Sequence, residues 1–306
     1  MSCKLFLHLN TQNITKMGQK ILITGASGGF GKLTVITLLG KGHQVAAAMR
    51  DINGKNKMVA DELNKAGAKI IELDVTSDQS VTIGVKKAMA DLGGLDVLIN
   101  NAGIGTLGMQ EFFTTSDYQK LFEVNVFGVQ RMNRAVSPYF RENKKGLIIY
   151  ISSLLGRIAM PFYGPYQSSK WALEAMAENY RVELSTFGIE NCIVEPGGYP
   201  TTFMVNLLKP SDNSQISAYG DFMKVPEQMF GAFENVLKNS PQQNPQKVAD
   251  AMVELIEKPY GEKPFRTTVD FIGMGDLVQK YNEHLEQITT GLYTNFGLNG
   301  LLTVKK

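Results

Sequence analysis

Short apolar runs alternate with longer amphipathic stretches from Lys20 to Glu195. The runs predict strands at 21–24, 44–49, 69–74, 95–100, 146–152 and 190–195. The stretches between them predict helices over 29–41, 54–66, 78–92, 117–136 and 164–187. Because helices of this length join the strands, the strands pair in parallel through right-handed crossovers. The pattern therefore predicts an α/β fold, a doubly wound parallel sheet of the Rossmann type with ligands at the carboxyl ends of its strands.

The regular alternation stops beyond Glu195, and 8 of the 11 prolines lie from Pro196 to Pro264. Segment 202–245 mixes bulky apolar residues with polar residues and helix breakers, which indicates either a lid over a pocket or ordinary helix packing. A helix is predicted at 246–257 and one more strand at 266–271. With no repeat or linker in view, we expect a single domain over 18–306 with a lid at about 202–245.

The first 17 residues carry only a brief apolar stretch and no small-residue cleavage site, so they do not resemble a signal peptide. We interpret residues 1–17 as a disordered lead, or Met17 as the true start of the protein. A chain with two cysteines, Cys3 and Cys192, has no disulfide framework, so we expect a reducing, cytoplasmic setting.

The 306 residues carry 31 basic and 29 acidic side chains, a net charge of +2. This balance excludes a broad electrostatic surface for nucleic acid or an acidic membrane, and no apolar run is long enough to span a bilayer. Three scattered histidines show no metal-ligand spacing, so no metal is expected. A small molecule is therefore the expected partner.

The stretch TGASGGFG, residues 24–31, follows the first predicted strand and opens the first helix. A glycine turn at this place presents free backbone N–H groups and the positive end of a helix dipole, which together bind a pyrophosphate. Gly25 is suited to the tight turn, Gly29 to the approach of the diphosphate, and Gly31 to close contact between helix and strand.

The residues after the second strand choose between the two nicotinamide dinucleotides. An acidic side chain there binds a free ribose 2′-hydroxyl, whereas an arginine binds a 2′-phosphate. Arg50 favours NADP(H), with its guanidinium also stacked on adenine. In the alternative interpretation Arg50 is a solvated charge and Asp51 selects NAD.

Tyr166 and Lys170 stand four residues apart, so a helix presents both on one face. The preceding strand delivers Ser152 and Ser153 to the same rim as the glycine turn. We expect the ammonium of Lys170 to lower the pKa of the Tyr166 phenol by a few units, so that the phenol exchanges a proton near neutrality. Ser153 would hydrogen-bond the substrate oxygen while hydride passes to or from the nicotinamide.

From Lys20 to about Thr201 the chain resembles the short-chain dehydrogenase/reductase family, in its shorter, non-extended type. The resemblance lies in TGASGGFG, in LDV at 73–75, in NNAG at 100–103, in EVNVFG around Asn125, in the Ser153, Tyr166 and Lys170 spacing, and in PGGYPT at 196–201. It implies a catalytic tetrad of Asn125, Ser153, Tyr166 and Lys170. The implied cofactor contacts are Gly25, Ser27, Gly29, Phe30, Gly31, Arg50, Asp74, Val75, Asn101, Ala102, Gly103, Tyr166, Lys170, Pro196, Gly197, Tyr199 and Thr201.

The resemblance implies an NADP(H)-dependent oxidoreductase that interconverts a carbonyl and an alcohol, and a homodimer or homotetramer. Gly28 departs from the basic residue that many NADP-dependent relatives carry there, so Arg50 alone argues for the phosphate. The alternatives are an NAD-dependent alcohol dehydrogenase, an NADP(H)-binding regulatory protein without turnover, and a nucleotide-sugar epimerase or dehydratase. The last would space its glycines as Gly-x-x-Gly-x-x-Gly, which this chain does not.

Overall fold

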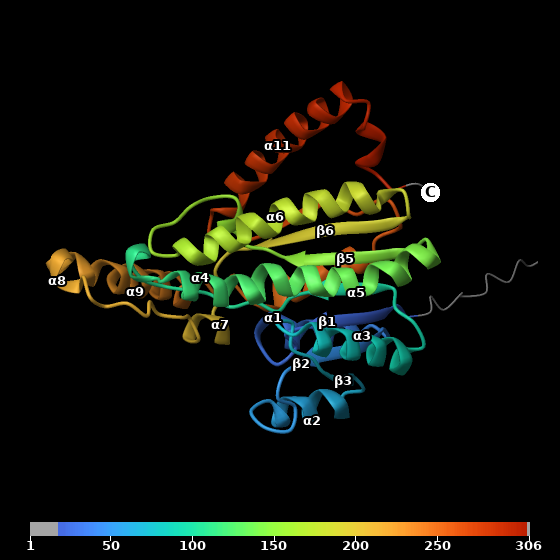
Figure 1. Ribbon diagram of the computed structural model, residues 1–306, viewed down its shortest axis with the longest axis horizontal. Helices are drawn as coiled ribbons and strands as arrows, with labels where there is room; N and C mark the ends of the chain where they lie inside the picture. The colour runs from blue at the N-terminus through green and yellow to red at the C-terminus, as the bar shows by residue number, and fades with distance from the viewer. Residues whose placement is uncertain (1–17, 305–306) are drawn as a thin grey trace, which may run out of the picture.

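The computed structural model describes residues 18–304, so the expectations for residues 1–17 lie outside the described part of the chain. Seven strands form one sheet in the order β3-β2-β1-β4-β5-β6-β7, and every neighbouring pair is parallel (Figure 1). The strands are β1 (Lys20–Thr24), β2 (Gln44–Met49), β3 (Lys69–Glu72), β4 (Val97–Asn100), β5 (Gly146–Ile151), β6 (Ile189–Pro196) and β7 (Arg266–Val269). The predicted doubly wound parallel sheet is confirmed, and β7 is the additional strand expected near 266–271.

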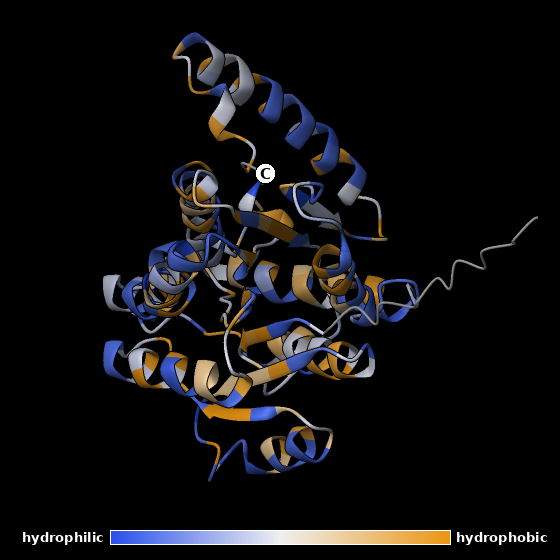
Figure 2. Cartoon of the chain, turned by 90° about the vertical axis from the view of Figure 1, so that its right-hand side faces the viewer, coloured by the Kyte–Doolittle hydropathy of each residue, from blue (hydrophilic) through white to orange (hydrophobic). Residues whose placement is uncertain are grey.

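Helices cover both faces of the sheet because alternate strand residues point to opposite faces. Ile21 and Ile23 share a core with α1 (Gly29–Gly40), α2 (Lys57–Lys65) and α10 (Gln246–Glu257). Leu22 shares the opposite core with α3 (Asp78–Leu92), α5 (Gly128–Asn143) and α6 (Gly164–Ser185). The central strands β1 and β4 are therefore largely apolar, whereas β7 (RTTV) at the edge is mostly polar, and Figure 2 shows strands that are orange in part.

The prediction of one continuous helix over 117–136 is wrong. The structure has α4 (Thr115–Phe122), a π-helical segment (Glu123–Phe127) and then α5. Apolar periodicity does not reveal a change of helical hydrogen-bond pattern, and short π-helical segments are often found at functional sites. The helix predicted at 54–66 likewise begins only at Lys57, because Gly54 and Asn56 donate backbone hydrogen bonds to the carbonyl of Asp51 in a turn.

Segment 202–245 forms α7 (Thr202–Val205), α8 (Ile216–Tyr219), the 3-10 helix η4 (Gly220–Lys224) and α9 (Val225–Lys238). In Figure 1, α8 and α9 lie at one end of the molecule, beside α4. Figures 1 and 2 both show α11 (Gly275–Asn295) standing away from the layered body. Short 3-10 helices complete the described chain: η1 (Gln110–Phe112), η3 (Leu154–Gly156) and η5 (Asn299–Leu301).

Within residues 18–304, none of the helices combines the length and the apolar character needed to cross a lipid bilayer.

Candidate active site

The glycine turn takes the conformation that its sequence predicts. Gly25 and Gly29 have φ of +67° and +50°, a left-handed backbone that side chains disfavour. A Cβ on Gly31 would lie 2.6 Å from Nδ2 of Asn101 and still closer to the carbonyl oxygen of Gly25. Gly31 therefore permits the close contact of α1 with the strand ends.

The N-terminus of α1 has no capping side chain. Its N-cap residue is Gly28, and no side chain accepts a hydrogen bond from the first turn. In α3, by contrast, the Ser77 hydroxyl accepts from the backbone N–H of Ser80. The first N–H groups of α1, together with the positive end of its dipole, therefore fit a diphosphate.

Residues after β4 are tied to the glycine turn through Thr24. Its Oγ1 accepts hydrogen bonds from the backbone N–H groups of Asn101 and Ala102, at 3.1 Å each. Nδ2 of Asn101 donates in return to the carbonyl oxygens of Thr24 and Gly25, at 2.9 and 3.1 Å. Asn101 and Ala102 thus lie against the glycine turn, Gly103 lies beside Asn125 and Lys170, and Thr24, which holds this contact together, was not singled out in the sequence.

The ends of β2 and β3 bring Arg50 and Asp74 together. Nη1 of Arg50 lies 3.6 Å from Oδ2 of Asp74, and the Arg50 side chain is 62% exposed. Partial burial raises the pKa of Asp74, but hydrogen bonds from Thr76 and the charge of Arg50 outweigh it and hold the pKa below its usual value. Val75, the next residue, packs against Gly128 at the start of α5.

Asp51 turns its carboxylate away from this edge. Its φ is +51°, and its Oδ2 accepts a hydrogen bond from the backbone N–H of Lys55 at 2.8 Å. The Asp51 backbone N–H donates to Oε1 of Glu72 at 2.7 Å. The carboxylate of Asp51 therefore makes its hydrogen bond within its own turn.

Ser153, Tyr166 and Lys170 meet at the carboxyl end of β5. All three side chains are buried, and the Ser153 hydroxyl lies close enough to the Tyr166 phenol to influence its pKa. Nζ of Lys170 lies 5.6 Å from the centre of the Tyr166 ring and donates to the carbonyl oxygen of Ile151 at 2.7 Å. Helix α6 positions the tyrosine and the lysine one turn apart, as the sequence predicted.

Asn125 joins the same site from the π-helical segment. Its Nδ2 donates to the carbonyl oxygen of Ile104 at 2.9 Å and to Oγ of Ser169 at 3.0 Å, and its Oδ1 accepts from the N–H of Ile104 at 2.9 Å. The side chain therefore joins the chain after β4 to α6, next to Tyr166 and Lys170.

The expectation that Lys170 lowers the pKa of Tyr166 is wrong for the protein described here. Burial raises the pKa of Tyr166 to about 12, against the opposing hydrogen bond from Ser153. Burial also lowers the pKa of Lys170 to about 8, and Glu174 opposes that change. The sequence does not reveal how deeply both groups are buried, and desolvation exceeds the effect of the charge.

The loop after β6 closes the far side of the site. Tyr199 is buried, donates its hydroxyl to the carbonyl oxygen of Val269 at 3.0 Å and packs edge-on against Phe30 with ring centres 5.5 Å apart. Thr201 lies opposite Gly29, where a Cβ on the glycine would come 3.7 Å from that of Thr201. Pro196 ends β6, Gly197 donates its N–H to the carbonyl oxygen of Val269 at 2.9 Å, and Ser27 lies partly exposed in the glycine turn.

Segment 202–211 covers these groups. The Phe203 ring lies 5.5 Å from the Tyr166 ring, and a Cβ on Gly105 would lie 2.6 Å from Leu207. The backbone N–H of Leu208 donates to the carbonyl oxygen of Gly105 at 2.8 Å. From the sequence, Phe203 was only part of a segment with bulky apolar residues, since nothing local assigns it to Tyr166.

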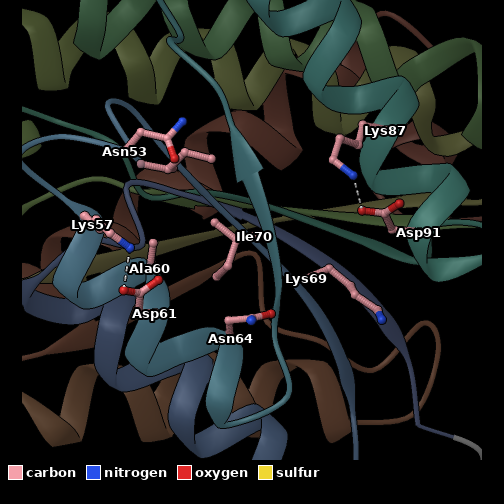
Figure 3. A pocket seen from close by; sticks show the side chains of 10 residues that line it. Asn53, Lys57, Ala60, Asp61, Asn64, Lys69, Ile70, Lys87 and Asp91 are labelled. Carbon is pink, nitrogen blue, oxygen red and sulfur yellow. Dashed lines mark hydrogen bonds and ion pairs between the residues drawn. The ribbon is translucent and has the colours of Figure 1, made fainter.

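A separate groove lies at the β3 edge of the sheet, between α2 and α3 (Figure 3). Two of its ammonium groups are already paired, Lys57 with Asp61 and Lys87 with Asp91, at 2.8 and 2.7 Å. None of the predicted site residues lines it, so it does not contribute to the site described above.

Comparison with known proteins agrees with this geometry. The family model described as short chain dehydrogenase matches residues 19–212. A 3-ketodihydrosphingosine reductase of Bacteroides thetaiotaomicron is 35% identical over 262 residues, 85% of this chain and 89% of the relative. Retinol dehydrogenase 8 of Homo sapiens is 34% identical over 248 residues, 77% of each chain.

The crystal structure of a short-chain dehydrogenase from Streptomyces avermitilis superposes with a TM-score of 0.69 at 28% identity, covering 92% of this chain and 98% of the other. The matched region contains the glycine turn, Asn125, Ser153, Tyr166 and Lys170. The chain therefore belongs to the short-chain dehydrogenase/reductase family, NAD(P)-dependent oxidoreductases that act on CH–OH and C=O groups.

Proposed function

We propose that this protein reduces the carbonyl group of an apolar substrate with NADPH, with Tyr166 as the proton donor. The observation that carries the proposal is the meeting of Ser153, Tyr166 and Lys170 beside an uncapped helix N-terminus and a glycine turn. A phenol, a hydroxyl and an ammonium in this arrangement match the needs of carbonyl reduction.

When bound at the glycine turn, NADPH would supply the hydride. The Ser153 hydroxyl donates a hydrogen bond to the substrate oxygen as that oxygen gains negative charge, and Tyr166 gives it the phenolic proton. The ammonium of Lys170, beside the Tyr166 ring, then favours the phenolate that remains.

The protonated Tyr166 phenol suits the reductive half of this reversible reaction. Because burial raises its pKa to about 12, the phenol is protonated throughout the neutral range. A proton donor is what reduction needs, whereas oxidation needs the phenolate as base.

The position of Arg50 supports a preference for NADPH. Its side chain is largely exposed at the end of β2, and its one ion pair, to Asp74, is long at 3.6 Å. A guanidinium with free donors suits a 2′-phosphate. Asp51 is the competing candidate for binding a ribose hydroxyl, but its carboxylate accepts a hydrogen bond from the backbone N–H of Lys55.

The proposed lid, residues 202–245, supports an apolar substrate. Aromatic rings extend from the catalytic tyrosine toward the outer helices: Phe203 lies against Tyr166, and Phe222 lies near Phe162 and Tyr219. The two curated relatives described above are named for a sphingosine derivative and for retinol. A long-chain ketone, a retinoid or a steroid would suit such a wall.

The test is the loss of NADPH absorbance with a panel of long-chain, retinoid and steroid carbonyls. Tyr166→Phe is expected to lower kcat at least about a hundredfold, since proton transfer by a positioned group contributes about 10²–10⁴-fold. NADPH binding should persist in this variant, because the phosphate contacts lie elsewhere. Turnover retained in Tyr166→Phe would refute the assignment, and no NADPH consumption by the wild type would favour a regulatory protein.

A further inference from the structure

A buried ionic cluster lies behind the catalytic residues. We use this term for Glu174 on α6, Glu195 on β6, Arg157 after η3, Arg266 on β7 and Asn282 on α11, all but Arg266 buried as whole residues. The four charged side chains are between 0 and 6% exposed. Burying charges costs free energy that their pairing often fails to recover, so stability alone is a weak reason for such a cluster.

Glu174 is the member of the cluster nearest to the catalytic machinery. It follows Lys170 by four residues on α6, so the two side chains lie on the same face of the helix. Its Oε2 lies 3.1 Å from Nε of Arg266 and 3.6 Å from Nη1 of Arg157. The carboxylate is thus held between two guanidinium groups on one side, with the lysine one turn away.

Glu174 also reaches the segment that carries the catalytic serine. A Cβ on Gly156 would lie 2.7 Å from Oγ of Ser152, 3.1 Å from Cγ of Glu174 and 3.3 Å from the carbonyl oxygen of Lys170, so these groups converge there. Burial raises the pKa of Glu174 above its usual value, and the guanidinium of Arg266 and the nearby Ser152 hydroxyl oppose that rise. Within residues 18–304, neither Ser152 Oγ nor Glu174 Oε1 has a hydrogen-bond partner.

Residues 152–157, which we call the serine segment, are held at both ends by this cluster. Ser152 lies against Glu174 at one end. At the other end, Nε of Arg157 donates to Oδ1 of Asn282 at 3.1 Å. The Arg157 guanidinium also lies over the rings of Trp171 and Tyr281. Ser153 stands between these two anchors.

We propose that Glu174 is a positioning residue for the reaction: its carboxylate keeps Lys170 in the ammonium form and fixes the serine segment against α6. The inference rests on the function proposed above, because it concerns the same site.

The charges around Lys170 explain why one carboxylate matters. Burial lowers the pKa of Lys170 to about 8, and Glu174 is the charged group that raises it. The titratable and charged groups that face the lysine and its carboxylate are Tyr166, Tyr163, Glu174 and Glu178 of α6 and its start, Arg157, Glu195 and Arg266. The guanidinium groups of Arg266 and Arg157 oppose the rise that burial causes in the pKa of Glu174, and burial together with the charge of Glu174 raises the pKa of Glu195 to about 7.

The direct test is a pH titration of Lys170 in the full-length protein. The titration is monitored by NMR with lysine labelled with ¹³C at Cε, and the Lys170 signal is assigned as the one missing from Lys170→Met. In Glu174→Gln the pKa of Lys170 should fall by about one pH unit or more, because an opposite charge has been removed. Glu183→Gln is the matched control: it removes an exposed carboxylate near the end of the same helix, outside the cluster, and should titrate as the wild type does. An unchanged Lys170 titration in Glu174→Gln overturns the charge part of the proposal.

Ser152→Ala tests the positioning part without changing any charge. We expect kcat for carbonyl reduction to fall about tenfold, with an unchanged KM for NADPH and an unchanged Lys170 titration. Wild-type kcat in Ser152→Ala overturns this part. Equal losses of kcat and NADPH binding in Glu174→Gln would show a merely structural role and overturn the whole.

The lysine titration needs no substrate, so it separates this inference from the proposed function. A wild type that consumes no NADPH refutes the function alone. A Lys170 pKa that ignores Glu174 refutes the inference alone.

Discussion

The proposed preference for NADPH depends on single side chains. Arg50 follows β2 with its guanidinium largely in solvent, while the carboxylate of Asp51, one residue later, accepts a hydrogen bond within its own turn. Sequence reasoning left these two as rivals, because adjacent residues at a strand end point in different directions that only the backbone fixes. The positive φ of Asp51 is the local reason for the difference.

Arg50→Asp should weaken NADPH binding by about 10- to 100-fold, the range of a lost hydrogen bond to a charged group. NADH has no 2′-phosphate, so its KM should change little. Steady-state kinetics with both cofactors measures the change. Lys65→Asp, which makes the same charge change at the end of α2, serves as control; equal losses in both variants would mean that Arg50 does not recognise the phosphate.

Gly31→Ala should destabilise the protein by about 1–3 kcal/mol and abolish NADPH binding, since its Cβ would meet Nδ2 of Asn101 at 2.6 Å and, closer still, the carbonyl oxygen of Gly25. Gly40→Ala, at the end of the same helix, has nothing within 4 Å of the new methyl group and should be neutral or slightly stabilising. Urea unfolding and NADPH titration compare the two. Similar behaviour of both variants would contradict the close approach at Gly31.

At the scale of elements, the break between α4 and α5 and the course of segment 202–211 set the shape of the site. The π-helical segment brings Asn125 to Ile104 and Ser169, and apolar periodicity gave no sign of it. Segment 202–211 is fastened by Asp117, whose Oδ2 accepts hydrogen bonds from Thr114 and from Oγ of Ser211, the latter at 2.6 Å. This contact joins residues 94 apart, which no local pattern encodes.

Ser211→Ala should loosen the proposed lid and make residues 202–245 more sensitive to proteolysis. Asp117 would keep its capping contacts with Thr114 but lose the hydroxyl of the lid, at a cost of about 1 kcal/mol. Limited proteolysis with identification of the cleavage sites measures this. Ser217→Ala, an exposed serine of α8, is the control, and cleavage that is no faster in Ser211→Ala than in Ser217→Ala would show that Asp117 does not hold the lid.

Over the whole molecule, the buried ionic cluster connects β6, β7, α6 and α11 behind the sheet's carboxyl end. Oε2 of Glu195 accepts from Nδ2 of Asn282 at 2.6 Å, while its Oε1 has no hydrogen-bond partner. The sequence showed these residues only as scattered charges, and α11 was not predicted at all. Charged residues inside apolar segments are the sequence feature that indicates such a buried cluster.

The cluster predicts that stability depends on pH through Glu195. Burial and the charge of Glu174 raise the pKa of Glu195 to about 7 from a usual value of 4.5. Between these values the folded state binds a proton that the unfolded state has released, so the free energy of unfolding falls as pH rises from about 5 to 7, by on the order of 1–3 kcal/mol.

Glu195→Gln carries no titrating carboxyl and should flatten this decline, as measured by urea unfolding at pH 5, 6, 7 and 8. Glu62→Gln, on the surface of α2, should retain the wild-type slope. A decline of equal size in Glu195→Gln would assign the pH dependence to another group.

The sequence pattern was enough to predict the alternation of strands and helices up to Glu195, the glycine turn and the placement of Ser153, Tyr166 and Lys170 on neighbouring elements. These follow from local periodicity and from spacing along one chain, and a parallel sheet leaves few ways to arrange them. Only the tertiary structure decided how deeply Tyr166 and Lys170 are buried, where Asp51 points, which residues lie over the tyrosine and which charges lie behind the lysine. These depend on contacts between residues far apart in the chain, where desolvation and packing outweigh anything that a neighbouring residue encodes.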